Sequence, residues 1–444
     1  MFSWFTYFQK IGGCKVKRLF GLISFVIVFS LVLTACSGGT SEQTQGGGKG
    51  SKQLTAWAWN INVPVLEKAA KEFEKANPGF KLKVVEMGND AVYSKLTTGL
   101  QAGGQGLPDI VLVEDDRAQG YLKSFPKKFV DLTKKGFDKH LDKFPGYKKE
   151  LLTKDGSIYG FPFDAGPTGV FYRTDYFQQA GVDPNKIETW DDLIEAGKII
   201  KEKVGVDLIG IDTNNDDGLY RMMLNQQGTF YFDKDENIQF TSEHSKKAME
   251  VNQKLIDAGL VKNTVGWDAW VSALAEGKVA IAPSGAWLSG SLTKQSPETK
   301  GKWGVFLLPA FEKGGNRAAN LGGGNFMIPS SSQNQDLAYK FMEFFATSNE
   351  AQEAAIKGGL FPSLNTVYNS TLFTAPDEFF GNQKIGELFA KEMNSIPTAN
   401  YTGNYSVAKD EAKKAQSEIM NGKNVETTLK DAEKRLKNRL ATKK

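Results

Sequence analysis

Short apolar runs that alternate with amphipathic helical patterns are the feature that most restricts the fold of this chain. Three strand-like segments, Leu54–Trp59, Leu82–Val85 and Ile110–Val113, are separated by two helix-like stretches. The third segment is a continuous apolar run bounded by turn residues, which is typical of a fully buried parallel strand. Strands that alternate with helices indicate a doubly wound α/β fold.

The same alternation continues toward the C-terminus. Asn62 is expected to cap the first helix, and Thr189 is expected to cap a helix over Trp190–Lys203, with Asp192 as its capping-box partner. A chain of 444 residues is too long for one hydrophobic core, so we expect two domains. The other predicted elements are strands over Gly166–Tyr172, Val279–Ala282, Trp303–Leu308 and residues 321–328, and helices over residues 93–102, 270–275, 337–345, 349–356 and 407–443.

The N-terminus has the composition of an export signal followed by a flexible tether. Basic residues precede an uncharged apolar run from Leu19 to Ala35, which ends in small residues. Leu33-Thr-Ala-Cys36 resembles a bacterial lipobox, in which a peptidase cuts before the cysteine and the thiol then carries lipid. We therefore predict a signal peptide over residues 1–35, lipidation of Cys36, and a tether over residues 36–53. An uncleaved membrane anchor is the alternative, because the apolar run is near the short limit of a spanning helix.

The net positive charge of the chain comes from this N-terminal segment. The chain has 55 basic and 51 acidic residues, and the difference equals the basic residues of the predicted signal, Lys10, Lys15, Lys17 and Arg18. The remainder is formally neutral, so we expect no nucleic-acid partner. The chain has 2 cysteines, and one of them leaves with the signal. No internal disulfide is expected.

Several enzyme classes lack their sequence motifs here. His140 and His244 lie among charged neighbours and are interpreted as surface residues. The sequence has no zinc-binding spacing, no Walker A loop and no Gly-x-Ser-x-Gly nucleophile elbow. Residues 212–218 have some calcium-loop character, but a polar turn is favoured because Met223 stands where the closing glutamate is required. We predict no catalytic residue, no metal and no cofactor. A glycosidase that uses a pair of carboxylates remains open, because such acids pair only in space.

Short motifs along residues 54–444 carry a resemblance to a known family. They are Phe73-Glu-Lys-Ala-Asn-Pro78; Pro108-Asp-Ile-Val-Leu-Val-Glu-Asp-Asp-Arg117; Ile158-Tyr-Gly-Phe-Pro162 with Tyr172; Thr189-Trp-Asp-Asp192; Ala275-Glu-Gly-Lys-Val-Ala280 with Gly285-Ala-Trp287; and Leu308-Pro-Ala-Phe-Glu-Lys-Gly-Gly315 with Leu321-Gly-Gly323. Each motif is weak alone. Together, behind a lipobox, they resemble the sugar-binding group of extracellular solute-binding proteins of ABC importers.

The resemblance implies a periplasmic-binding-protein-like clamp of two lobes, each a doubly wound α/β sheet, with a helix-rich C-terminal region. It implies an N-terminal lobe over 54–163 plus 324–370 and a C-terminal lobe over 167–320 plus 371–444. Crossovers are expected near Phe163–Gly166, Asn320–Gly324 and Val367–Thr374. The ligand of this family is held in the cleft between the lobes.

Sugar binding requires flat aromatic rings for the apolar face of a pyranose and planar polar side chains for its hydroxyls. In open α/β sheets such groups are expected at the carboxyl ends of the strands. Trp59 and Asn60 follow the first predicted strand, and alternation along that strand places Trp57 inward and Trp59 toward the cleft. Asp116 and Arg117 match the maltodextrin binders residue by residue. Trp287 occupies the position where these relatives stack an aromatic ring.

Further candidates come from the same resemblance. Asp164 lies at the first crossover, although the acidic residue that relatives carry two places later is Gly166 here. Trp267 and Trp270 are either cleft or core residues. The remaining predicted ligand residues are Tyr220, Asn225, Gly323, Gly324, Asn325, Tyr401, Asn404 and Tyr405.

The sequence thus predicts a lipid-anchored receptor that captures a carbohydrate and delivers it to the permease of an ABC transporter. Its expected location is the extracytoplasmic face of the bacterial cell membrane, and a monomer is expected. A receptor for a charged solute such as a polyamine, peptide or phosphate is one alternative. An exported glycosidase or polysaccharide lyase is the other.

Overall fold

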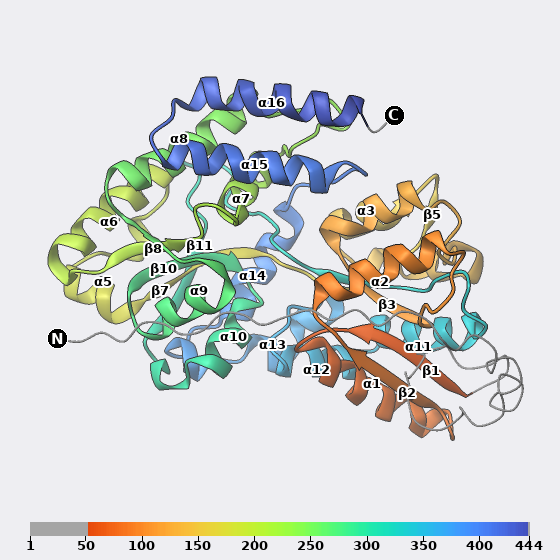
Figure 1. The fold of residues 1–444 in the computed structure, drawn as a ribbon. Helices are drawn as coiled ribbons and strands as arrows, with labels where there is room; N and C mark the ends of the chain where they lie inside the picture. The colour runs from red at the N-terminus through yellow and green to blue at the C-terminus, as the bar shows by residue number, and fades with distance from the viewer. Residues whose placement is uncertain (1–51, 443–444) are drawn as a thin grey trace, which may run out of the picture. The chain divides into compact units, whose positions relative to one another are not determined.

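The computed structural model describes residues 52–442, which belong to one compact unit containing two mixed sheets (Figure 1). The predicted signal, Cys36 and nearly all of the predicted tether lie outside these residues. The first sheet has the strand order β2-β1-β3-β12-β6 and the second β11-β7-β10-β8-β9. A two-stranded sheet pairs β4 (Thr153–Lys154) with β5 (Ser157–Ile158).

The first sheet is parallel only in part. It contains β1 (Gln53–Ala58), β2 (Lys81–Glu86), β3 (Ile110–Glu114), β6 (Phe161–Asp164) and β12 (Gly324–Met327). β1 runs parallel to β2 and β3, whereas β12 runs antiparallel to β3 and β6. Burial of Ile110–Val113 is confirmed. The prediction of a parallel strand is therefore correct for only one neighbour of β3. β1 is parallel to it, whereas β12, which comes from a distant part of the chain, is antiparallel.

Helices cover both faces of this sheet (Figure 1). On one side lie α1 (Asn62–Ala76), α11 (Gln335–Thr347) and α12 (Asn349–Lys357), and on the other α2 (Asn89–Gln101) and α3 (Asp115–Ser124). α4 spans Gly146–Leu152. Asn62 is not the N-cap of α1, contrary to the prediction. It is the first helical residue, and its side-chain amide donates to the Trp59 carbonyl at 3.0 Å.

The second sheet contains β7 (Thr168–Arg173), β8 (Asp207–Ile211), β9 (Val261–Asn263), β10 (Val279–Gly285) and β11 (Trp303–Leu307). β8 is parallel to β9 and β10, and β7 is antiparallel to β10 and β11. Around it lie α5 (Thr174–Ala180), α6 (Trp190–Val204), α7 (Gly218–Gln226), α8 (Glu243–Asp257), α9 (Gly266–Ala275) and α10 (Leu288–Gln295). The capping box of Thr189 and Asp192 is confirmed.

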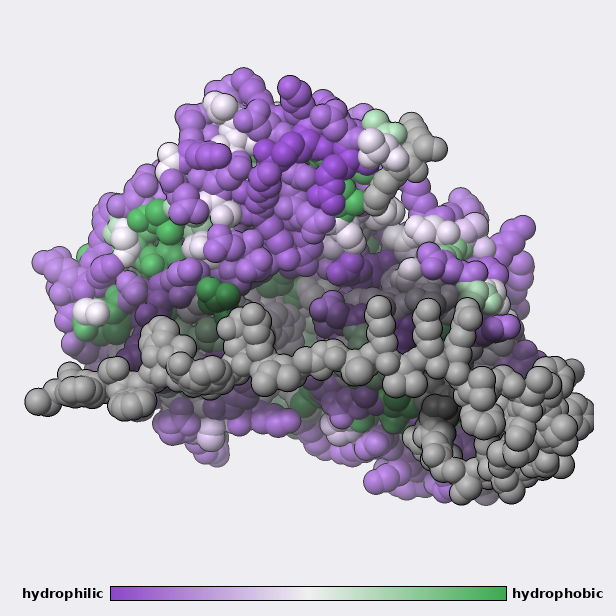
Figure 2. Space-filling model, viewed as in Figure 1, coloured by the Kyte–Doolittle hydropathy of each residue, from purple (hydrophilic) through white to green (hydrophobic). Residues whose placement is uncertain are grey.

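The C-terminal region is helix-rich, as predicted. It contains α13 (Thr371–Thr374), α14 (Ile385–Glu392), α15 (Tyr405–Met420) and α16 (Val425–Ala441). The helix-dominated region predicted over residues 407–443 contains two helices, α15 and α16, and Figure 2 shows a largely hydrophilic surface over them. Short 3-10 helices lie at Thr133–Lys135, Phe137–Lys143, Pro184–Lys186, Pro297–Thr299, Asn365–Asn369, Glu378–Phe380 and Met393–Ser395.

Each sheet has its own hydrophobic cluster. One cluster joins residues from Leu54 to Phe163 with residues from Phe326 to Val367. The other draws mainly on residues from Ala165 to Ala319 and from Phe361 to Leu436. The lobe boundaries inferred from the family resemblance stay a prediction.

The crossovers between the sheets lie against one another. Pro167 and Asn320 form an antiparallel bridge, and the Leu321 N–H donates to the Gly166 carbonyl at 2.8 Å. A Cβ atom at Gly166 would overlap the Leu321 carbonyl oxygen. Gly166 therefore allows this close approach. A residue with a side chain does not fit at this position, which is the one where the family resemblance leads us to expect an acidic residue.

Among the described residues, no helix combines the length and apolar character needed to cross a membrane.

Candidate functional site

The candidate site lies where the carboxyl ends of strands from both sheets approach each other. Asp115, Asp116 and Arg117 form the first turn of α3, directly after β3. The carboxylates of Asp115 and Asp116 thus lie at a helix N-terminus, where the helix dipole favours negative charge. Trp287 follows β10 at the start of α10.

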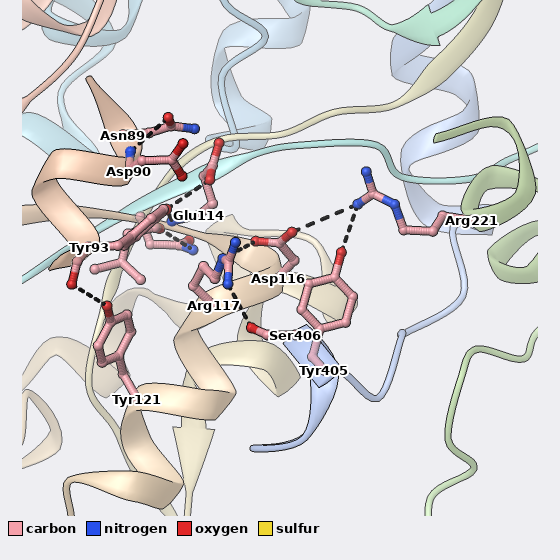
Figure 3. A network of polar contacts seen from close by, with 12 residues as sticks. Asn89, Asp90, Tyr93, Glu114, Asp116, Arg117, Tyr121, Arg221, Tyr405 and Ser406 are labelled. Atoms are coloured by element: carbon pink, nitrogen blue, oxygen red, sulfur yellow. Dashed lines mark hydrogen bonds and ion pairs between the residues drawn. The ribbon is translucent and has the colours of Figure 1, made fainter. Parts of the chain in front are cut away.

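Charged side chains connect α3 to elements of the second sheet (Figure 3). Arg221 on α7 donates to the Tyr405 hydroxyl at 3.0 Å, and its guanidinium lies 3.8 Å from Oδ2 of Asp116. Arg117 donates from Nη1 to the Ser406 hydroxyl at 2.7 Å. These contacts join residues that are far apart in the sequence.

Backbone groups make a second set of contacts between α3 and the loop before α15. The side-chain carbonyl of Gln119 accepts hydrogen bonds from the backbone N–H groups of Tyr401, at 2.7 Å, and Thr402, at 3.2 Å. A Cβ atom at Gly120 would lie 3.6 Å from the Thr402 carbonyl oxygen. These hydrogen bonds and this close approach place α3 against the loop.

Glu114 and Tyr93 form a buried pair beside Asp116. The Tyr93 hydroxyl donates to Oε2 of Glu114 at 2.8 Å. Burial, and to a smaller extent the nearby charge of Asp116, raise the pKa of Glu114 to about 7. Burial also raises the pKa of Tyr93. A protonated carboxyl group and a phenol can donate to ligand oxygens as well as accept from ligand hydroxyls.

A buried lysine ties the end of β3 to both neighbouring crossovers. Lys148, on α4, is 0% exposed and donates to Oδ1 of Asp115 at 2.5 Å. Its ammonium group also donates to the carbonyl oxygens of Asp164, at 2.9 Å, and Gly324, at 3.2 Å. Asn325 donates to the same oxygen of Asp115 at 2.7 Å. These bonds assign Lys148 and Asp115 a role in holding the crossovers together.

Asp164 is buried beside this ion pair, and its charge state should affect stability. The pKa of its carboxyl group is raised to about 7, mainly by burial; the charge of Lys148 opposes this rise and the charge of Asp115 adds to it. A carboxyl group whose pKa is higher in the folded protein stabilises the fold at acidic pH, and this contribution is lost as the pH rises toward 7.

We therefore expect the free energy of unfolding of the Asp164→Asn variant to fall less than that of the wild type between about pH 4 and pH 7. Urea unfolding measured across this range checks the prediction. Equal pH slopes for the two proteins would contradict it.

The other predicted ligand residues differ in their exposure to solvent: some are exposed or half-buried, and others are buried against neighbouring side chains. Trp59 is 8% exposed and meets the Tyr93 ring edge-on at 5.8 Å, while Trp57 is 3% exposed. Asn60 is exposed and has a left-handed backbone with φ 51°. Asn404 is half-buried and precedes α15.

Tyr220 and Asn225 use their polar atoms within the second sheet region. The Tyr220 hydroxyl is 2.7 Å from that of Ser245, in the contact between α7 and α8. Asn225 donates to the Pro397 carbonyl at 2.8 Å and accepts from the Asn320 N–H at 2.7 Å. The polar atoms of both side chains thus have partners within the protein, and neither residue belongs to the proposed ligand set.

Aromatic rings gather on the second sheet's side of the site. Tyr405 stacks on Tyr231, with ring centroids 5.9 Å apart, and meets Tyr401 edge-on at 5.2 Å. The Trp287 indole N–H donates to the Leu321 carbonyl at 2.9 Å, which fixes the ring beside the crossover. Gly323, next along this crossover, has φ 92°, and a Cβ there would lie 2.5 Å from Oδ2 of Asp115.

Four buried polar atoms in this region have no hydrogen-bond partner among the described residues: Oδ2 of Asp115, Oδ1 of Asp116, Nε of Arg117 and Oδ1 of Asn325. All four belong to the carboxyl end of β3 and the adjoining part of β12. Buried polar atoms without partners cost free energy, so such a group is expected to acquire partners from a ligand or water. No cluster of potential metal ligands occurs within residues 52–442.

Sequence reasoning missed Tyr93, Gln119, Lys148 and Arg221. Arg221 stands beside the predicted Tyr220, so the segment was identified while the contacting residue was not. No sequence signal marks Lys148, because its partners come from distant segments.

Comparison with known proteins places this geometry in a family. The family model for bacterial extracellular solute-binding proteins matches residues 68–381. The chain belongs to this family. The resemblance found in the sequence motifs is thereby confirmed.

Individual relatives of this solute-binding protein agree in length and fold. It is 36% identical over 362 residues to a lactose-binding protein of Rhizobium radiobacter, covering 79% of this chain and 84% of the relative. It is 30% identical over 338 residues to an arabinooligosaccharide-binding protein of Bacillus subtilis, covering 74% and 76%. A solved structure of an ABC transporter associated binding protein from B. animalis subsp. lactis, in complex with β-1,6-galactobiose, is 27% identical. It has a TM-score of 0.72, covering 87% of this chain and 96% of that one. The predicted two-lobed α/β fold is confirmed.

Proposed function

We propose that this solute-binding protein captures a di- or oligosaccharide between the carboxyl edges of its two sheets. The observation that carries the proposal is the group of four buried polar atoms that lack a hydrogen-bond partner beside aromatic rings; two of them, Nε of Arg117 and Oδ1 of Asp116, form an ion pair at 3.7 Å. Sugar hydroxyls both donate and accept, so they can bond carboxylate oxygens and a guanidinium N–H alike. The ligands named for the relatives, lactose, arabinooligosaccharide and β-1,6-galactobiose, support a carbohydrate.

Charge at the site favours a neutral ligand. Arg221 already pairs with Asp217 at 3.1 Å and approaches Asp116 at 3.8 Å, and Arg117 lies 3.7 Å from Asp116. A phosphate or polyamine would need an excess of one sign of charge, whereas these charges are matched. The proposal therefore favours a sugar over a charged solute.

In the proposed complex, Asp116 and Arg117 bond ligand hydroxyls, and Trp287 stacks on the apolar face of a ring. The exposed Asn60 contributes from the end of β1. Tyr401 and Asn404 contribute from the loop before α15, and Tyr405 from the first residue of that helix. Glycines 323 and 324, with Asn325, allow the ligand to approach the crossover closely. Asp164 acts through the crossover and does not contact the sugar.

Ligand capture is proposed to work as a clamp. Contacts of α3 with Arg221, Ser406 and the Tyr401–Thr402 backbone hold the two edges together. A sugar can form hydrogen bonds to both sheet edges at once only when the two edges are close together. Its higher affinity for the closed arrangement drives closure.

The proposal extends to delivery and location. The receptor is proposed to act as a monomer on the extracytoplasmic face of the bacterial membrane, to hand the sugar to the permease of an ABC transporter, and to perform no chemistry on it. Lipid on Cys36 is the proposed anchor.

Cys36→Ser is expected to release the protein from the membrane. Each buried CH₂ of a lipid chain contributes about 0.8 kcal/mol, and stable anchoring needs more than one chain. Fractionation of cells that express either form checks this. Wild-type protein found wholly in the soluble fraction, or retaining residues 1–35, would contradict the anchor.

Titration calorimetry with lactose, β-1,6-galactobiose, raffinose and arabinooligosaccharides tests the proposed function. We expect saturable binding of at least one sugar, and chromatography should recover that sugar intact. Cleavage of the sugar would instead support a glycosidase or lyase. If none of the sugars binds and spermidine or phosphate does, the charged-solute alternative holds.

A further inference from the structure

Trp267 is exposed in a way that is unusual for a tryptophan. It is the second residue of α9 and is 46% exposed; the other large hydrophobic residues exposed among the described ones are Val265, at 61%, and Ile199, at 39%. Exposing a large aromatic ring to water is unfavourable, because its apolar surface gains free energy on burial. Because this exposed ring lies next to the proposed ligand site, it is available to stack on a ligand.

Trp267 is the outer member of a group of three indole rings. Its ring centroid is 5.9 Å from that of Trp287, with the planes at 40°, and 5.5 Å from that of Trp270, with the planes at 48°. Trp287 and Trp270 are partly buried and pack against the hydrophobic cluster of the second sheet. The group thus leads from the proposed stacking ring, Trp287, out to the surface.

The position of Trp267 is fixed by the end of β8. The Gly266 N–H donates to Oδ2 of Asp212, the residue that follows β8, at 3.0 Å. Asp212 also accepts from the backbone N–H groups of Asn214 and Asn215, at 3.1 and 3.0 Å. The start of α9 is therefore held at the carboxyl edge of the sheet, the same edge that carries Trp287 at the end of β10.

We propose that Trp267 is an additional stacking surface for a sugar unit beyond the one on Trp287, and that it sets the preference for chain length. This inference rests on the proposed function. Asp268 follows Trp267 in the first turn of α9 and is also exposed, so this turn offers a carboxylate to hydroxyl groups of that unit as well. Aromatic ring plus neighbouring carboxylate is the combination that a pyranose requires.

A protein surface is the less favoured occupant. Protein docking sites on monomers usually have contiguous apolar patches of several hundred Å². Among the described residues, the other exposed large hydrophobic side chains are those of Val265 and Ile199. Val265 is near Trp267 in the sequence, whereas Ile199 lies on α6. A single exposed ring in contact with Trp287 fits a small ligand better than a protein surface.

The test compares sugars of increasing length, namely β-1,6-linked galactobiose and galactotriose, and melibiose, raffinose and stachyose. Calorimetry first finds the series that the wild type binds, and then measures Trp267→Ala on it. We expect Trp267→Ala to weaken binding of the longest sugar about tenfold, and binding of the disaccharide less than twofold. Trp267→Phe should retain most of the affinity, because it keeps an aromatic face.

Val265→Ala is the matched control, because it removes exposed apolar surface two residues away, at the residue before α9, without removing a ring. It should leave all affinities unchanged. Equal losses for every chain length, or no loss for any, would overturn the inference and leave the proposed function intact. If the wild type binds none of these sugars, nor lactose or arabinooligosaccharides, the proposed function fails and the inference falls with it.

Discussion

Lys148→Ala is expected to lower the free energy of unfolding by about 3–5 kcal/mol, the range measured when one partner of a buried ion pair is removed. The substitution leaves Asp115 charged and 1% exposed, and it removes donors from the carbonyl oxygens of Asp164 and Gly324. Urea unfolding followed by circular dichroism measures the change.

Two further variants separate this effect from a general loss of charge. Lys75 pairs with Glu72 on the surface of α1, with a side chain 72% exposed, so Lys75→Ala should change stability little. The double variant Lys148→Met/Asp115→Asn should recover part of the loss, because it removes both buried charges. If Lys148→Ala is as stable as Lys75→Ala, the proposed role of this lysine at the crossovers is wrong.

Trp287→Ala is expected to weaken sugar binding by about 2–4 kcal/mol, as for aromatic hot spots. The ring is held beside the crossover by its bond to the Leu321 carbonyl, so its removal takes away an oriented surface. Titration calorimetry with the tightest-binding sugar of the panel measures the effect.

Trp303 provides the contrast, because it is 0% exposed in the core of the second sheet. Trp303→Phe should lower the melting temperature and leave sugar affinity unchanged. A Trp287→Ala protein with a much lower melting temperature and full affinity would show that Trp287 is a core residue.

Local sequence signals predicted the elements better than the contacts between them. The capping box at Thr189 was predictable because both partners lie within one helical turn. The antiparallel neighbour of β3 was not, because β12 enters the sheet more than two hundred residues later. Asn62 shows a limit even locally, since a residue suited to capping forms the first helical turn instead.

The candidate site was predictable to the extent that it follows strand ends. Asp116, Arg117 and Trp287 come directly after buried strands, and the structure has them at the carboxyl edges. The partners that complete the site, Gln119 with the Tyr401 backbone for example, meet only when both sheets have formed. Spacing in the sequence carries no information on such contacts. Likewise, only burial in the folded chain distinguishes Trp267, which is exposed, from Trp270, which packs against the hydrophobic cluster of the second sheet.

Hydrogen exchange with and without the tightest-binding sugar tests the central claim most directly, because it reports both binding and its location. We expect saturating sugar to slow exchange in the first turn of α3, in residues 320–325, in residues 401–406 and at the start of α10. Surface segments such as the middle of α16 should exchange at unchanged rates. Protection confined to a region away from both sheet edges, or none at all with binding confirmed by calorimetry, would contradict the proposed site.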